Sequence, residues 1–145
     1  MRYDKIELYV HLVWTTWDRL PLITADIERA LFRSIGEVAQ NSGCKVLAIN
    51  GMPDHIHVLL RIPATLPVSK LVQQLKGYSS HFANQQLQLE YKFKWSGFYG
   101  AFSVSRWDIQ RIMTYINRQK EHHNTNELVE DLEKYFSNYD GPIRT

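Results

Sequence analysis

The fold and the chemistry of this 145-residue chain are both indicated by the stretch Met52-Pro53-Asp54-His55-Ile56-His57-Val58-Leu59-Leu60-Arg61-Ile62. The run Val58 to Ile62 is typical of a β-strand, because it is rich in aliphatic and β-branched residues and prolines bracket it. Side chains alternate along a strand, so His55 and His57 point to the same face. The other face is apolar and must be buried; it consists of Ile56, Val58, Leu60 and Ile62. This strand therefore has one core face and one polar face.

Three further strands are predicted around it. Residues 6–14 alternate, and the face expected to be buried holds Ile6, Leu8, Val10, Leu12 and Trp14. The opposite face of this strand holds Glu7, Tyr9, His11 and Val13. Lys45 to Ile49 is a second strand, and the turn residues Asn50-Gly51 predict a hairpin that leads into the histidine strand. Phe98 to Val104 is the last predicted strand.

Helical spacing of apolar residues predicts three helices. The first begins after the N-cap Thr24 and ends near Asn41-Ser42-Gly43. The second has Pro67 in its first turn, and its inner stripe is Val68, Leu71, Val72, Leu75, Ser79, Phe82 and Gln86. The third opens at Ser105-Arg-Trp-Asp108, which resembles a capping box. Its stripe is Ile109, Ile112, Met113, Ile116 and the alkyl stem of Lys120.

The order of these elements is β-α-β-β-α-β followed by a helix, which is the ferredoxin-like α+β pattern. It predicts a four-stranded antiparallel sheet with two helices on one face and a further C-terminal helix beyond them. The opposite face is expected to be open and to carry His55, His57, Tyr9 and His11. We expect one domain over residues 1–145, with residues 123–145 as its acidic C-terminal tail and a short helix from Glu127 to about Phe136.

Composition and charge narrow the class of protein. The chain is 44% hydrophobic, which suffices for one core of its own. A lone Cys44 excludes an internal disulfide and suits a reducing cytoplasm. No secretory leader pattern and no apolar run near 18 residues is seen, so we expect a soluble cytoplasmic protein without membrane contact. Residues 1–119 hold 14 basic and 9 acidic side chains, which is compatible with a polyanionic partner.

Two histidines on one strand and a tyrosine on the third predicted helix suggest a functional site. Two imidazoles one pleat apart can bind one cation, although they could equally be polar positions on a half-exposed strand. On the third helix Tyr115 and Gln119 share one face, and His122 continues their line. The line runs beside the apolar stripe, where a tyrosine usually packs with its hydroxyl at the solvent edge.

Five segments, in the same order, resemble the single-tyrosine HUH transposases of the insertion-sequence 200/605 group. They are His11-Leu-Val-Trp-Thr-Thr-Trp-Asp-Arg19, Asp54-His-Ile-His57, Leu71-Val-Gln-Gln-Leu-Lys-Gly-Tyr-Ser-Ser80, Trp95-Ser-Gly-Phe-Tyr-Gly-Ala-Phe102 and Tyr115-Ile-Asn-Arg-Gln119. The resemblance covers nearly the whole chain and implies the same ferredoxin-like fold. It implies a homodimer in the cytoplasm, associated with the nucleoid, that acts on single-stranded DNA folded into hairpins at element ends. No small-molecule substrate is implied.

The resemblance also assigns roles to residues. His55 and His57 would be metal ligands, Gln119 the third ligand through its carbonyl oxygen, and Tyr115 the nucleophile. His122 could replace Gln119. Asp54 could orient a neighbouring ligand or simply shape the turn, and His11 could support the site or be a surface residue.

The implied chemistry is cleavage and rejoining of DNA. Imidazoles alone would suit zinc or copper, whereas an amide oxygen also allows Mg²⁺ or Mn²⁺, and the resemblance favours these two. The unperturbed tyrosine pKa is ~10, so Tyr115 needs help from the metal, Arg118 or Lys120 to ionise. Its attack would form a 5′-phosphotyrosine and release a 3′-OH, which permits rejoining without ATP.

DNA contacts are predicted from basic and aromatic residues. The basic candidates are Arg19, Lys70, Lys76, Lys92, Lys94, Arg106 and Arg118, and the stacking candidates are Tyr78, Trp95 and Trp107.

Three alternatives stay open at this point. The first is a domesticated nuclease that processes palindromic repeats; its relatives often have Asn-Pro where this chain has Arg118-Gln119. The second is a non-catalytic nucleic-acid-binding module, although the aromatic motif of RNA-recognition domains is absent from the histidine strand. The third is a metal-free structural domain.

Overall fold

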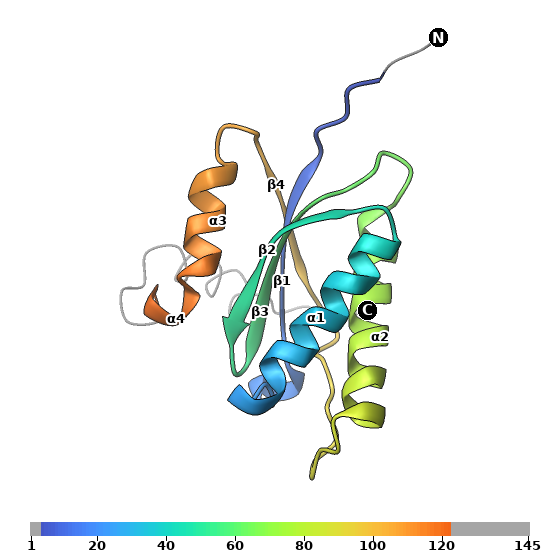
Figure 1. The fold of residues 1–145 in the computed structure, drawn as a ribbon, viewed down its shortest axis with the longest axis vertical. Helices are drawn as coiled ribbons and strands as arrows, with labels where there is room; N and C mark the ends of the chain where they lie inside the picture. Colours follow the sequence, from blue (N-terminus) through green and yellow to red (C-terminus); the bar gives the residue numbers. More distant parts are fainter. Residues whose placement is uncertain (1–3, 123–145) are drawn as a thin grey trace.

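The computed structural model describes residues 4–122, and these form a four-stranded antiparallel sheet with helices on both faces (Figure 1). The elements are β1 (Tyr9–Thr15), the 3₁₀ turn η1 (Trp17–Arg19), α1 (Ala25–Asn41), β2 (Lys45–Met52), β3 (His55–Arg61), α2 (Val68–Gln86), β4 (Gly100–Val104), α3 (Ile109–Asn117) and α4 (Gln119–His122). The strand order is β2-β3-β1-β4. The chain therefore has the ferredoxin-like α+β architecture that its sequence predicts.

The main core lies between the sheet and the helices α1 and α2, which pack side by side on one face (Figure 1). The apolar face of β3 is buried as predicted, since Ile56, Val58 and Leu60 are inaccessible to solvent. Leu12 and Trp14 of β1 lie in the same core. Burial on this face fixes which way the histidines of β3 point, because neighbouring residues of a strand face opposite sides.

The other sheet face is covered by α3, so the expectation that it is open is wrong. A second, smaller core forms there from Ala48, Leu59, Ile112, Tyr115 and Ile116. The apolar side of α3 packs against β2 and β3. The His57 ring packs against Tyr115 of this helix, and His11, His55 and His57 are all buried, each with 5% or less of its surface exposed.

The strands β1 and β4 both begin later along the chain than predicted. β1 begins at Tyr9, which pairs with Arg61 at the end of β3. Ile6 and Leu8 therefore lie beyond that pairing and are 36% and 48% exposed. β4 begins at Gly100 rather than at Phe98, since its ladder with β1 runs from Val13↔Gly100 to Tyr9↔Val104.

The β2–β3 hairpin turns at Pro53-Asp54, and the prediction of a turn at Asn50-Gly51 is wrong. Asn50 pairs with His57 and Gly51 with Ile56 inside the ladder. A Cβ at Gly51 would overlap the carbonyl oxygen of His55 across the ladder. The glycine therefore permits a close approach of two strands rather than a turn.

The helices begin and end where the sequence predicts, except at the two ends of α3. α1 begins after Thr24 and α2 after Pro67, as predicted. α3 begins one turn later than expected: its N-cap is Asp108, and no side-chain capping bond forms there. It also ends at Asn117, and α4 follows as a separate turn.

Two residues predicted to lie in the buried stripes of the helices do not. Gln86 is exposed, and Lys120 is exposed with its ammonium hydrogen-bonded instead of its alkyl stem buried. The predicted acidic tail (residues 123–145) and its short helix lie outside the described residues. None of the helices in the described range is long and apolar enough to span a membrane.

Candidate active site

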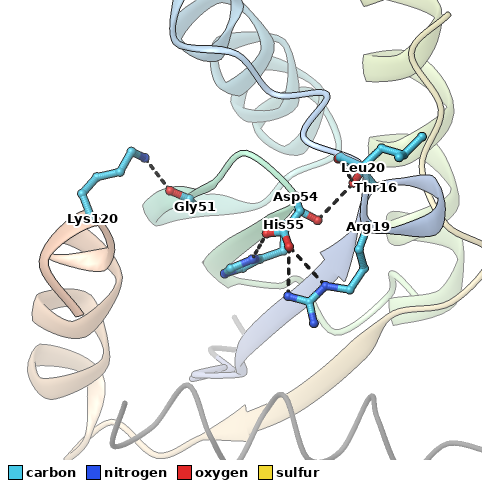
Figure 2. Close-up of polar contacts among 7 residues, drawn as sticks. All are labelled: Thr16, Arg19, Leu20, Gly51, Asp54, His55 and Lys120. Carbon is cyan, nitrogen blue, oxygen red and sulfur yellow. Dashed lines mark hydrogen bonds and ion pairs between the residues drawn. The ribbon is translucent and has the colours of Figure 1, made fainter. Parts of the chain in front are cut away.

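His55 opens β3, and the turn before it supplies its partner. The Nδ1 atom of His55 lies 2.7 Å from Oδ1 of Asp54 (Figure 2). An ionised carboxylate accepts a hydrogen bond from an N–H at this nitrogen, and in the neutral ring this leaves Nε2 of His55 with a free lone pair. Asp54 thus selects the ring tautomer that can bind a cation.

His57 has an equivalent partner on the neighbouring strand. Its Nδ1 lies 3.0 Å from Nε2 of His11. Burial, together with the neighbouring His11 and His55, holds the pKa of His57 well below its ordinary value, and burial lowers the pKa of His11 to about 4. Both rings are neutral near pH 7, so one nitrogen of the pair donates and the other accepts. Nε2 of His57 is buried and has no hydrogen-bond partner within residues 4–122.

Tyr115 and Gln119 approach the histidines from the C-terminal helices. The Tyr115 ring packs edge-on against His57 with 5.6 Å between ring centroids, and the two histidine rings of β3 are 5.2 Å apart. Tyr115 is 5% exposed, so it lies in the buried face of α3 rather than beside it. Gln119 is fully buried one turn later, and neither of its amide atoms has a hydrogen-bond partner in the described part of the chain.

These unpaired atoms are a physical reason to place a ligand here. A buried polar group without a partner costs about 1–3 kcal/mol, and Gln119 and His57 together present three such atoms. Within residues 4–122 no group of three or more His, Cys, Asp or Glu side chains could hold a metal ion. Among these residues, a third protein ligand for a cation bound by the two histidines would therefore be of another type, such as an amide.

Comparisons with known proteins identify the family of this chain. A family model described as "Transposase IS200 like" matches residues 4–119. The chain belongs to the IS200-like transposase family.

Named relatives extend this result. The chain is 27% identical over 120 residues to the ISDra2 transposase of Deinococcus radiodurans, covering 79% of this chain and 86% of that protein. It is 28% identical over 116 residues to the transposase for insertion sequence element IS200 of Salmonella typhimurium, covering 77% and 76%.

Two solved structures share the fold. A crystal structure of a protein assigned as a transposase from Deinococcus radiodurans R1 has a TM-score of 0.64 and 26% identity, covering 82% of this chain and 95% of that one. The structure of a REP-associated tyrosine transposase bound to a REP hairpin has a TM-score of 0.64 and 15% identity, covering 85% and 72%.

In this IS200-like transposase, α4 is tied to the sheet and to α1. The ammonium of Lys120 donates to Asn50 Oδ1 (3.0 Å) and to Glu28 Oε1 (2.9 Å). It also donates to the carbonyl oxygen of Gly51, the contact that Figure 2 shows. Asn50 Nδ2 also donates to the Asn117 carbonyl oxygen (3.2 Å). The sequence pattern missed this tether, because Asn50 is assigned to a turn there.

Arg19 contacts Asp54, although the sequence pattern assigns it to DNA. Its Nε and Nη2 lie 3.2 Å and 3.1 Å from Oδ2 of Asp54 (Figure 2). Burial raises the pKa of Asp54, but its hydrogen bonds and electrostatic interactions with His55 and Arg19 outweigh burial and hold that pKa below its ordinary value. Asp18 and Arg19 both have positive φ, 53° and 51°, a strained conformation for residues other than glycine.

The remaining basic candidates are spread over the transposase. Arg106 lies near Glu7 and 4.5 Å above the Trp107 ring, whereas Arg118 pairs with Glu121 at 2.8 Å. Lys70 is exposed, but Lys76 is buried, which the sequence pattern did not anticipate.

Of the aromatic candidates, Tyr78 and Trp107 are exposed. Trp95 is buried with its Nε1 donating to Ser79 Oγ, so it offers no face to a base. The side chain of His122, the alternative ligand, lies outside the described part.

Proposed function

We propose that this transposase cuts and rejoins single-stranded DNA at hairpin-bearing element ends through attack by Tyr115. The observation that carries the proposal is the packing of Tyr115 edge-on against His57, whose buried Nε2 has no hydrogen-bond partner among the described residues. A nucleophile beside a cation site is what phosphodiester cleavage by tyrosine requires.

The residues present fit a divalent cation, Mg²⁺ or Mn²⁺. We assign Nε2 of His55, Nε2 of His57 and Oε1 of Gln119 as its protein ligands, because the last two are buried polar atoms without partners in residues 4–122. Asp54 and His11 hold the opposite nitrogens of the two rings. Such outer partners orient a ligand and set its tautomer. When bound, the cation neutralises charge that develops on the non-bridging phosphate oxygens.

Tyr115 carries out the covalent step. Its phenolic oxygen attacks phosphorus in line, the bond from phosphorus to the 3′ oxygen breaks, and the released 3′ oxygen takes up a proton. The products are a 5′-phosphotyrosine and a free 3′-OH. Because the phosphodiester energy is retained in the protein–DNA bond, attack by a 3′-OH reverses the step and rejoins DNA without ATP.

Hairpin DNA as substrate is supported by the REP-associated tyrosine transposase, whose structure contains a REP hairpin. We propose the same class of substrate here, with a homodimer as the acting form. A sheet-face binding module of the RNA-recognition type fits less well. The face such a module would use is covered by α3 in this chain.

The test is covalent capture of DNA. Labelled single-stranded hairpins from the flanks of the gene are incubated with Mg²⁺, Mn²⁺ or chelator, for the wild type and the Tyr115→Phe and Tyr78→Phe variants. We expect a metal-dependent adduct, stable in denaturing gels, that Tyr115→Phe abolishes and the exposed control Tyr78→Phe retains. An undiminished adduct in Tyr115→Phe would refute the nucleophile, and binding without any adduct would favour a binding module.

A further inference from the structure

A basic groove lies between α2 and residues 92–99, outside the site described above. Its volume is about 880 Å³. Four lysines line it, namely Lys70, Lys76, Lys92 and Lys94, and no Asp or Glu does. The surface groove along α1, of about 790 Å³, differs because Glu37 lies among its basic residues. The α2 groove therefore combines space with uncompensated positive charge.

Lys76 gives this groove a buried cation. It is 9% exposed, and its ammonium donates to the carbonyl oxygens of Ser96 (2.6 Å) and Phe98 (3.3 Å). Among residues 4–122 no carboxylate pairs with it, and burial lowers its pKa to about 8. Two neutral carbonyls do not balance a charge, so an anion entering the groove would recover the cost of burying it.

The groove is connected to the catalytic site through the 3₁₀ turn η1. The ammonium of Lys94, at the groove, lies 3.8 Å above the ring of Trp17, and Trp17 N donates to the Lys94 carbonyl oxygen (2.9 Å). Trp17 is 49% exposed. Two residues further, Arg19 pairs with Asp54, which holds His55. Cations and an exposed aromatic ring thus form a chain of contacts from the groove to a candidate metal ligand.

We propose that this groove binds phosphates of the single-stranded DNA substrate, with Trp17 stacking on a base between the groove and Tyr115. The proposal rests on the proposed function for the identity of the strand. Lysines recognise phosphates as point charges, and base stacking on an aromatic ring tolerates any sequence. The groove would hold the strand that leads to the scissile phosphate and contribute affinity rather than chemistry.

Gly77 allows the groove to be filled without disturbing the fold. It lines the groove, and a Cβ there would meet no atom within 4 Å. Side chains are also favoured over glycine inside a helix. Gly77→Glu adds a carboxylate at the wall of the groove, whereas Gly77→Ala is the matched control. We expect at least tenfold weaker binding of a fluorescein-labelled oligothymidylate to Gly77→Glu, and wild-type binding to Gly77→Ala.

The salt dependence of the DNA-binding constant measures the number of phosphate contacts. For single strands the slope of log K against log salt changes by about 0.7 per phosphate contact. Lys70→Ala and Lys92→Ala should each lower the magnitude of the slope by about 0.7, and Lys45→Ala, in the α1 groove, should leave it unchanged. Tryptophan fluorescence should be quenched on binding in the wild type and not in Trp17→Phe.

All binding is measured in chelator and in the Tyr115→Phe background, so a failure of the cleavage proposal does not alter the result. Wild-type affinity and slope in Gly77→Glu, Lys70→Ala and Lys92→Ala would overturn the groove proposal. An equal loss in Lys45→Ala would also overturn it, because it would show a general effect of net charge. If the groove variants lose affinity but the wild type forms no adduct in the covalent-capture test, the groove proposal stands and the cleavage proposal fails.

Discussion

Nε2 of His11 on β1 lies 3.0 Å from Nδ1 of His57 on β3, and the His57 ring packs against Tyr115 of α3. The two strands are adjacent, and His11 pairs with Leu59 in the ladder, so the contact runs diagonally across the sheet face. Because burial lowers the pKa of His11 to about 4, its ring is neutral near pH 7 and can accept a hydrogen bond. His57 can then donate from Nδ1 and keep Nε2 free.

Replacing His11 should weaken metal binding without removing a ligand. His11→Ala deletes the acceptor that orients His57, and loss of such a partner typically costs 10–100-fold in metal affinity. Titration calorimetry with Mn²⁺ measures this directly. His11→Gln, which keeps an acceptor, should lose less. Equal Mn²⁺ affinity in the wild type and His11→Ala would show that the contact has no role in metal binding.

Asp54→Asn tests the contact between Asp54 and His55, the other histidine proposed as a metal ligand. The amide keeps the shape of the carboxylate but loses the charge that Arg19 and His55 share. We expect about tenfold weaker Mn²⁺ binding. Arg19→Gln should produce a smaller loss, because Asp54 still contacts His55 in that variant. If Arg19→Gln had the larger effect, Arg19 would act on the site by a route other than Asp54.

The sequence predicted the fold because the pattern of each strand is local. Alternation in β1 and β3 identifies which residues enter the core. The buried face of β3 is confirmed, whereas that of β1 is confirmed at Leu12 and Trp14 but not at Ile6 and Leu8, which are exposed. The hairpin turn was misplaced for a reason that alternation cannot reveal. Gly51 is required by the carbonyl oxygen of His55 on the opposite strand, a contact that only exists once the hairpin has formed.

The site was harder to predict than the fold. The spacing of Tyr115 and Gln119 places them on one helical face, but their burial depends on how α3 docks on β2 and β3. Lys76 is a similar case, because its acceptors lie 20 and 22 residues further along the chain. Arg19 was assigned to DNA on charge alone, and its pairing with Asp54 depends on the positive φ angles of η1.

The tether at Lys120 should affect both stability and the site. Lys120→Met removes the contacts to Glu28, Asn50 and Gly51, and we expect the free energy of unfolding to fall by about 1 kcal/mol. Adduct formation should fall further, because Gln119 is the neighbouring residue. Urea denaturation and covalent capture measure the two effects. Arg111→Met, which removes the exposed ion pair with Asp108, is the control and should change neither.

The buried ammonium of Lys76 should make stability depend on pH. Burial lowers its pKa from 10.5 to about 8 in the folded protein, while the unfolded chain keeps the ordinary value. Between these two pH values the unfolded state binds more protons, so the free energy of unfolding rises with pH. The charged groups that line the same groove are Lys70, Lys92 and Lys94, and all three carry the same sign.

The comparison with Lys76→Met isolates this effect, because other titrations are common to both proteins. We expect the difference in unfolding free energy, wild type minus variant, to be constant below about pH 8 and to increase from there toward pH 10. Urea denaturation at several pH values across this range measures it. A difference that stayed constant up to pH 10 would mean that Lys76 titrates at its ordinary pKa, and that the groove already compensates its charge.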